Sequence, residues 1–415
     1  MLLRRATLFI AMAFFLVGAE NSNQKDISSS YSPKLSFGGL VGFEGAYINQ
    51  TINTPENIRK VHMGLGALFL NAAAVGEAEN GLIYSLNARF FADGNKTFVN
   101  PVTLLDSSLK DKITGNKIMQ GVNLVDRLWI ELKGKKWGTL HIGNYPGAND
   151  LMIEDSSSVM GGNGGMIFGN WSYYANIPYG VVTSYRQIGD PRSSTKISYY
   201  TTRFGQLLQL GVSYSPRSDV FGLGKYTQKP LSGDTASEHV WGGGVNISKE
   251  ISGVNVKIGA SGVTSKSIDK EGVSDDLSDV ITWEAAAHVT TGPIDFAVGY
   301  LQNGTSLLKN ADVKNGKNAG SFYDAAISYT LGSLKLALGG MWSVSSLEKN
   351  DAGNNFPAKL NAYSLTADYK LFNGLTAYVD VTKFNGETDE TLSQSDTKNK
   401  SNDGYVGFIG LNISF

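Results

Sequence analysis

Most of this chain alternates between apolar and polar residues with a period of two, and the alternating stretches are short. In residues 82–90 one face carries Leu82, Tyr84, Leu86, Ala88 and Phe90, and the other carries Ser85, Asn87 and Arg89. A period of two with one apolar face predicts a β-strand that separates an apolar phase from water.

The pattern recurs along almost the whole chain. The expected strands are 34–49, 62–75, 82–90, 122–133, 139–145, 195–203, 207–215, 238–249, 254–265, 280–291, 293–302, 322–331, 334–345, 359–371, 375–383 and 403–415. The connections alternate strictly between short turns with glycine or asparagine and long polar loops. An even number of strands of about ten residues, with short turns at one end and long loops at the other, is typical of a bacterial outer-membrane barrel. We therefore predict an all-β fold, a transmembrane antiparallel β-barrel of about 16 strands.

One span interrupts the alternation, from residue 146 to residue 194. It carries three acids, Asp150, Glu154 and Asp155, followed by a glycine cluster at 161–169. A loop of about 50 residues without strands is uncommon in a compact domain and is usually functional. We interpret the strands as a closed wall and this loop as a segment folded inside it. The glycines lack the spacing of a phosphate-binding loop, so they indicate loop flexibility.

The first residues have the features of an export signal. Arg4 and Arg5 precede an apolar core at 8–17, and small residues follow at 17–19. This order predicts a cleaved signal peptide over 1–19. Residues 20–33 are polar and rich in serine, which favours a flexible leader before a barrel that spans 34–415.

Composition excludes several kinds of chemistry. There are 36 basic and 37 acidic residues, so the chain has no basic excess for binding nucleic acid. It has no cysteine, which excludes thiolate metal sites, thiol catalysis and disulfides. Its four histidines are scattered without metal-ligand spacing, and no serine lies in a Gly-x-Ser-x-Gly turn. We expect no cofactor and no metal site.

Several segments resemble the trimeric porins of Gram-negative outer membranes, the general diffusion porins. Residues 127–134 (RLWIELKG) and 137–143 (WGTLHIG) are similar to the porin hairpin that precedes the third loop. Residues 196–200 (KISYY) with Phe204 and Gly205 are similar to the strand and turn after it. The alternating strand that ends at Phe415 resembles the family's assembly signal.

The resemblance implies a homotrimer in the outer membrane, in contact with lipid and lipopolysaccharide. It also implies a third loop, here 146–194, that folds into the lumen as a constriction. In such a constriction the loop acids face basic residues of the wall. On this chain the expected constriction residues are the loop acids Asp150, Glu154 and Asp155 and the wall residues Arg89, Arg127 and His141, which share the wet face of their strands.

These features lead to one main hypothesis, a water-filled channel for passive diffusion of small hydrophilic solutes and ions, with no enzymatic activity. Two alternatives stay open. The first is a solute-specific porin for sugars or anions. The second is a barrel-type outer-membrane enzyme or adhesin, since a catalytic triad drawn from separate strands leaves no local motif.

Overall fold

The structure is a computed structural model. It describes residues 33–51, 61–92, 125–175, 187–189, 194–218, 237–268, 277–349, 355–387 and 401–415. The expected signal peptide and most of the expected leader lie outside the described residues. So do residues 122–124, which we had expected to begin the fourth strand.

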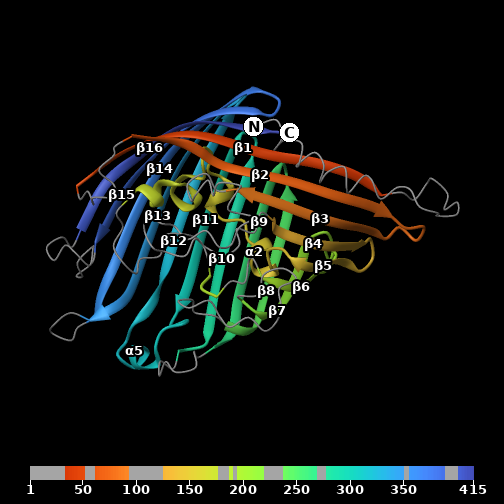
Figure 1. Cartoon of the computed structure of the whole chain (residues 1–415), viewed down its shortest axis with the longest axis horizontal. Helices are drawn as coiled ribbons and strands as arrows, with labels where there is room; N and C mark the ends of the chain where they lie inside the picture. Colours follow the sequence, from red (N-terminus) through yellow and green to blue (C-terminus); the bar gives the residue numbers. More distant parts are fainter. Residues whose placement is uncertain are drawn as a thin grey trace, which may run out of the picture.

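The described part of the chain forms sixteen antiparallel strands that close into a barrel (Figure 1). The strands are β1 (Lys34–Gln50), β2 (Val61–Glu77), β3 (Ile83–Ala92), β4 (Val125–Gly134), β5 (Gly138–Asn144), β6 (Thr195–Tyr200), β7 (Leu208–Arg217), β8 (Ser237–Ile251), β9 (Val254–Ser267), β10 (Val280–Thr291), β11 (Ile294–Gly304), β12 (Asn318–Leu331), β13 (Leu334–Lys349), β14 (Asn355–Phe372), β15 (Leu375–Glu387) and β16 (Ser401–Ser414). The predicted fold class is confirmed.

The first and last strands close the ring. β1 pairs with β16 from Leu40 opposite Ser414 to Gln50 opposite Gly404. Beyond the ladder, the Gly39 amide donates to the Phe415 carbonyl at 2.9 Å, and the Phe415 amide donates to the Gly39 carbonyl at 3.2 Å. Closure gives the backbone groups of both edge strands a partner, which a lipid environment requires.

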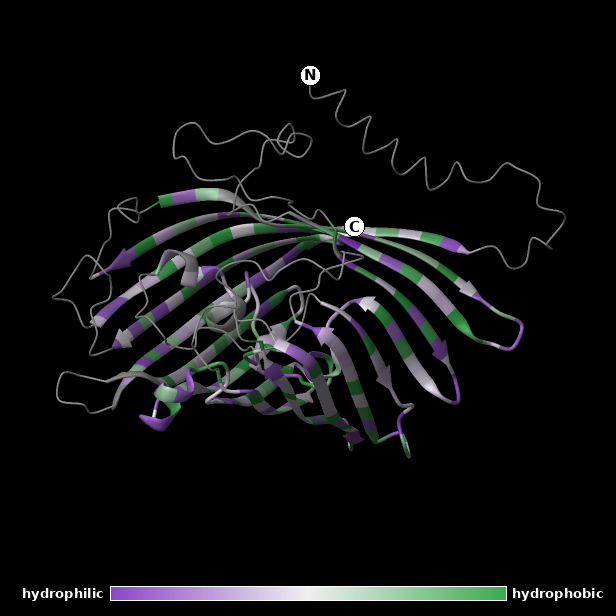
Figure 2. Cartoon of the chain, turned by 60° about the horizontal axis from the view of Figure 1, so that its bottom comes forward, coloured by the Kyte–Doolittle hydropathy of each residue, from purple (hydrophilic) through white to green (hydrophobic). Residues whose placement is uncertain are grey.

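The alternation in the sequence separates the two faces of the wall. In β1, Phe43 and Tyr47 are 47% and 45% exposed, whereas Glu44 and Ile48, each the next residue along, are 5% and 2% exposed. Figure 2 shows the alternating hydropathy along the strands. The exposed side chains are mostly apolar and face outward, as expected for a wall in contact with lipid.

Aromatic rings form a belt on the outer face toward the ends with the long loops. Neighbouring strands contribute rings in contact, with centroid distances of 4.7 Å for Tyr214–Trp241, 5.1 Å for Trp283–Tyr300, 4.6 Å for Tyr300–Tyr323 and 5.8 Å for Trp342–Tyr363. Such belts lie at the membrane–water interface, where the apolar ring and the polar tip of each side chain are both accommodated.

The described part of the segment between β5 and β6 lies inside the barrel, drawn in yellow in Figure 1. This described part contains four short helical turns, α2 (Ala148–Leu151), η2 (Ser156–Ser158), α3 (Gly165–Phe168) and α4 (Trp171–Tyr174). A fifth, α5 (Asn310–Lys314), lies between β11 and β12. Among the described residues, no helix is long and apolar enough to cross a membrane.

Candidate functional site

A buried lysine of the wall holds the two ends of the loop together. Lys196 of β6 is 3% exposed, and its Nζ donates to the carbonyls of Tyr145 and Ser194, each at 2.7 Å. Tyr145 opens the loop and Ser194 closes it. A buried ammonium group needs hydrogen-bond partners, and here its two hydrogen bonds fix both ends of the loop to the wall.

The first turn of the loop packs on β7, β8 and β9. The amide of Ala148 donates to Ser213 Oγ at 2.6 Å, and Asn246 Nδ2 donates to the carbonyl of Met152 at 3.1 Å. A Cβ added at Gly244 would lie 2.6 Å from Cβ of Met152. The glycines of β8 therefore allow close packing of the loop.

Glu154 joins the loop to β9 and β10. Lys257 Nζ donates to both of its carboxylate oxygens, at 2.8 and 2.7 Å, and His288 Nδ1 lies 3.1 Å from Oε2. His288 Nε2 also lies 3.3 Å from Asp295 Oδ1. Burial raises the pKa of the loop residue Glu154, but the hydrogen bonds and charges of Lys257 and His288 outweigh burial and hold that pKa below its ordinary value.

Asp155 has a different environment from its neighbour. It is 7% exposed, and its Oδ1 accepts from the amide of Ser157 at 2.8 Å as the cap of η2. Burial raises the pKa of Asp155. The next amide, of Ser156, donates to Asp324 Oδ1 on β12 at 3.1 Å. These contacts fix the path of the loop along the wall.

The glycine cluster is docked on acids of the wall. The amide of Gly162 donates to Asp368 Oδ1 at 2.7 Å, and the amide of Gly165 donates to Asp380 Oδ2 at 3.2 Å. Asn170 Nδ2 donates to Glu44 Oε1 at 2.8 Å. We had interpreted these glycines as flexible. In the structure, Gly162 and Gly165 instead donate backbone N–H groups to carboxylates of the wall, because glycine allows the backbone to approach closely.

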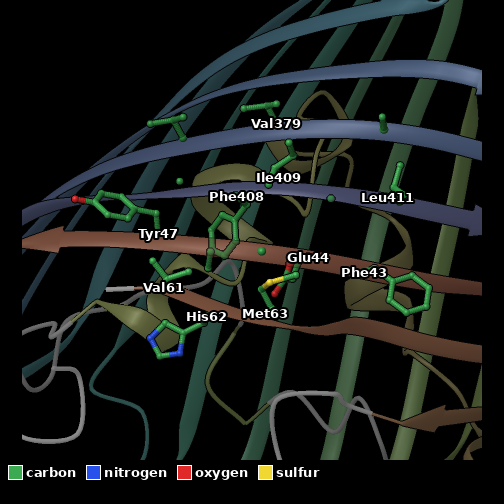
Figure 3. A pocket seen from close by; sticks show the side chains of 16 residues that line it. Phe43, Glu44, Tyr47, Val61, His62, Met63, Val379, Phe408, Ile409 and Leu411 are labelled. Carbon is green, nitrogen blue, oxygen red and sulfur yellow. The ribbon is translucent and has the colours of Figure 1, made fainter. Parts of the chain in front are cut away.

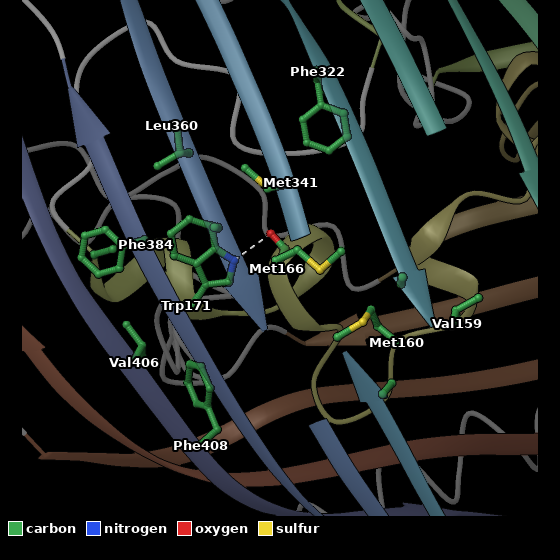
Figure 4. Packing of buried hydrophobic residues seen from close by; sticks show 14 of the residues in the cluster. Val159, Met160, Met166, Trp171, Phe322, Met341, Leu360, Phe384, Val406 and Phe408 are labelled. Carbon is green, nitrogen blue, oxygen red and sulfur yellow. Dashed lines mark hydrogen bonds between the residues drawn. The ribbon is translucent and has the colours of Figure 1, made fainter. Parts of the chain in front are cut away.

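An apolar cluster fills the lumen between this part of the loop and strands β11–β16 and β1. The loop contributes Val159, Met160, Met166, Trp171 and Ala175, and the wall contributes inward side chains that include Phe322, Met341, Leu360, Phe384 and Phe408 (Figure 4). Trp171 is 1% exposed, its ring stacks on Phe384 at 5.8 Å, and its Nε1 donates to the Met166 carbonyl at 2.9 Å. This half of the barrel interior is a packed core.

The opposite wall carries basic and aromatic side chains. Arg89 of β3 and Arg127 of β4 are direct partners in the ladder. Arg89 Cζ lies 4.9 Å from the ring centroid of Phe69, and Arg127 Cζ lies 5.6 Å from that of Tyr145. The Tyr145 ring is also 4.2 Å from that of Trp129.

His141 of β5 completes this group. Its Nε2 lies 2.8 Å from Glu131 Oε2 on β4, and its ring meets the Tyr145 ring edge-on at 5.0 Å. The structure thus brings Arg89, Arg127 and His141 together around Tyr145. It places Glu154 away from them, beside Lys257 and His288, and buries Asp155 against the wall.

Two residues that contact the loop, Lys257 and His288, were not identified from the sequence. Lys257 lies on the inward face of β9, since Ile258 beside it is 50% exposed, and His288 is on the inward face of β10. Strict use of the alternation would have identified both. Among the described residues, no group of three or more His, Cys, Asp or Glu side chains is arranged to hold a metal ion.

A groove also runs along the outer wall over the β1–β16 seam (Figure 3). Its lining includes Phe43, Tyr47, Met63, Ile409 and Leu411, and it is largely apolar. It lies on the outer face of strands whose inner face packs against the loop, since Glu44, which accepts from Asn170 of the loop, is also part of its lining.

Comparison with known families and proteins adds to this picture. A family described as Gram-negative porin matches residues 6–389. Two uncharacterized proteins, from Rickettsia prowazekii (strain Madrid E) and Rickettsia typhi, are each 27% identical over 139 residues, which is 34% of this chain and 29% of theirs. The matched region therefore spans less than a third of the length of these curated relatives.

Solved structures share the fold. The anion-selective porin from Comamonas acidovorans superposes with a TM-score of 0.58 at 16% identity. A mutant of the Rh. blastica porin gives 0.52 at 15%, and the loop L8 deletion mutant of OmpT, an outer membrane protein of Vibrio cholerae, gives 0.51 at 13%. Each covers 92% of this chain and 100% of the other. At these identities the similarity is one of fold.

Proposed function

Since the chain belongs to the Gram-negative porin family, we propose that its barrel is a water-filled channel of the outer membrane, through which small hydrophilic solutes and ions diffuse passively. The observation that carries this proposal is the asymmetry of the lumen. The loop is docked on the wall from β7 around to β1, and the face with Arg89, Arg127 and His141 lies on β3–β5. Solutes pass between the loop and this face.

We further propose that charge at this passage sets ion selectivity. Asp150 and Glu154 of the loop, with Arg89 and Arg127 of the wall, create a field across the lumen, which low-dielectric walls focus. Asp155 contributes by fixing the loop, since its carboxylate caps η2. The wall acids that hold the glycine cluster, Asp368 and Asp380, lie on the side of the lumen against which the loop packs, away from the face on β3–β5.

Conductance of purified protein in planar bilayers tests the proposal. We expect an ohmic channel in KCl, with a zero-current potential in a salt gradient that responds to the charges at the passage. Protein that inserts but conducts no ions would contradict it. Family and fold support a channel over an enzyme or an adhesin, and hydrolytic activity without a pore would reverse that preference.

The surroundings of the channel are part of the same proposal. We propose a homotrimer in contact with lipid and lipopolysaccharide, reached by export through a signal peptide at 1–19. The resemblance to trimeric porins and the aromatic belt support it. Chemical cross-linking in isolated outer membranes should give a trimer band, and a ladder that stops at the monomer would contradict it.

A further inference from the structure

We propose that the lumenal face of β3–β5 carries a retention site for small aromatic carboxylates, formed by Arg89, Arg127, Trp129 and Tyr145. This inference rests on the proposed channel function and names a solute class for it. It would make the channel favour such anions over aliphatic anions of similar charge.

The first support is the placement of the two arginines. They are direct cross-strand partners on one face, so their Cβ atoms lie about 5 Å apart. Two guanidinium groups on one face can donate together to one carboxylate, and such charge-assisted hydrogen bonds are strong. Guanidinium groups present N–H donors in a fork that fits the two oxygens of a carboxylate.

The second support is the set of rings around these donors. Arg89 Cζ lies 4.9 Å from the Phe69 ring and Arg127 Cζ lies 5.6 Å from the Tyr145 ring. Trp129 follows Arg127 on the same face, about 7 Å along the strand. Its ring lies 4.2 Å from that of Tyr145, at an interplanar angle of 31°. An aromatic ring attached to the bound carboxylate would contact these two rings, and aromatic pairs are attractive beyond the area that they bury.

The third support is the position of a nearby acidic side chain. Glu131 follows on the same face of β4, and its carboxylate contacts His141 at 2.8 Å. His141 also meets the edge of Tyr145. Glu131 is thus held toward β5, which keeps its negative charge directed away from the arginine pair.

The test uses purified full-length protein in planar bilayers at pH 7.5. Potassium chloride, acetate and benzoate are compared by the dependence of current on anion concentration. We expect linear currents with chloride and acetate, and a benzoate current that saturates. Trp129→Leu should raise the half-saturating benzoate concentration about two- to tenfold, as loss of one ring contact predicts, while the chloride current stays linear in concentration.

Two further variants keep the test decisive. Arg127→Gln should raise the benzoate half-saturation and also lower anion selectivity in KCl. Arg203→Gln is the matched control, because it removes one positive charge whose guanidinium donates to Asn246 Oδ1 at 3.1 Å, away from the site, and it should leave half-saturation unchanged. If Trp129→Leu does not insert, Tyr145→Leu replaces it with the same expected rise, because Tyr145 supplies the other ring that the bound solute contacts.

The outcomes separate this inference from the function on which it rests. Absence of a KCl conductance contradicts the channel and this inference together. A normal KCl channel whose benzoate current rises linearly, in proportion to anion mobility, overturns the retention site alone. An unchanged half-saturation in Trp129→Leu or Tyr145→Leu also overturns it, because the rings then take no part.

Discussion

Replacement of Trp171 by alanine should release the loop from the wall while the barrel stays intact. Trp171 is buried between the loop and β15, stacks on Phe384 and donates to the Met166 carbonyl at 2.9 Å. Removal of a fully buried tryptophan side chain costs about 3–5 kcal/mol. The cost falls on docking of the loop, since the sixteen-stranded ladder does not depend on this side chain.

The effect on the loop follows from the free energy of local opening. Docked segments open with free energies between about zero and the global stability. For a docking free energy of about 5 kcal/mol, about one molecule in 5,000 is undocked. Loss of 3–5 kcal/mol raises that fraction to between about one in 30 and one half. Trp171→Phe keeps one aromatic ring on Phe384 but loses the hydrogen bond and the second ring of the indole, together about 2 kcal/mol, so it should raise the fraction only about thirtyfold, to below about one in 100.

Single-channel recording measures this opening. Trp171→Ala should show larger or fluctuating conductance levels and increased open-channel noise, and Trp171→Phe should lie close to wild type. Thermal unfolding of the barrel, followed by circular dichroism, is the control for global stability. Wild-type conductance and noise in Trp171→Ala, with an intact barrel, would refute the conclusion that the apolar cluster holds the loop.

Three further predictions follow from the loop, the seam and the leader. The pKa of Glu154 is lowered in the folded loop, so its ion pairs stabilise docking fully at pH values above the ordinary pKa of 4.5, and this stabilisation is lost as the pH falls through the lowered pKa. Channel noise in the wild type should therefore rise at that low pH, and Glu154→Gln should show the same noise already at pH 7. Wild-type noise that does not change with pH would contradict the role of the pair. Deletion of Phe415 removes two backbone hydrogen bonds to Gly39 and should lower the yield of folded barrel more than Phe415→Leu does, with the conductance of inserted protein unchanged; equal yields would oppose this. N-terminal sequencing of protein from outer membranes should begin near Glu20, and a sequence that begins at Met1 would exclude cleavage.

The strands could be predicted from the sequence because each carries its own local pattern. In β14, Leu365 is 58% exposed and Thr366 beside it is 1% exposed, as the alternation indicates. The apolar-outward pattern reverses in β15 near the long loop that follows it. There Phe384 points inward and is 0% exposed, while Lys383 faces outward. A strand read alone gives no reason for this reversal. Its reason is Trp171, which lies more than 200 residues earlier in the sequence and packs on Phe384.

The path of the loop could not be predicted either, because its contacts are with residues far away in the sequence. The amide of Gly165 finds its acceptor in Asp380, 215 residues later, and that of Ser156 finds Asp324, 168 residues later. Parity places both aspartates on the inner face, but it does not identify their partners. Similarly, parity placed Arg89 and Arg127 on one face, and only the register of β3 and β4 makes them direct partners.

The central claim is that ions pass between the docked loop and the arginine face of β3–β5. The most direct test is the zero-current potential across a KCl gradient at about 10 mM ionic strength, where the Debye length is about 30 Å. Arg127→Ser should shift this potential toward cation selectivity relative to wild type, and Glu154→Gln should shift it toward anion selectivity. Unchanged potentials in both variants would contradict the claim, because neither charge would then lie at the passage.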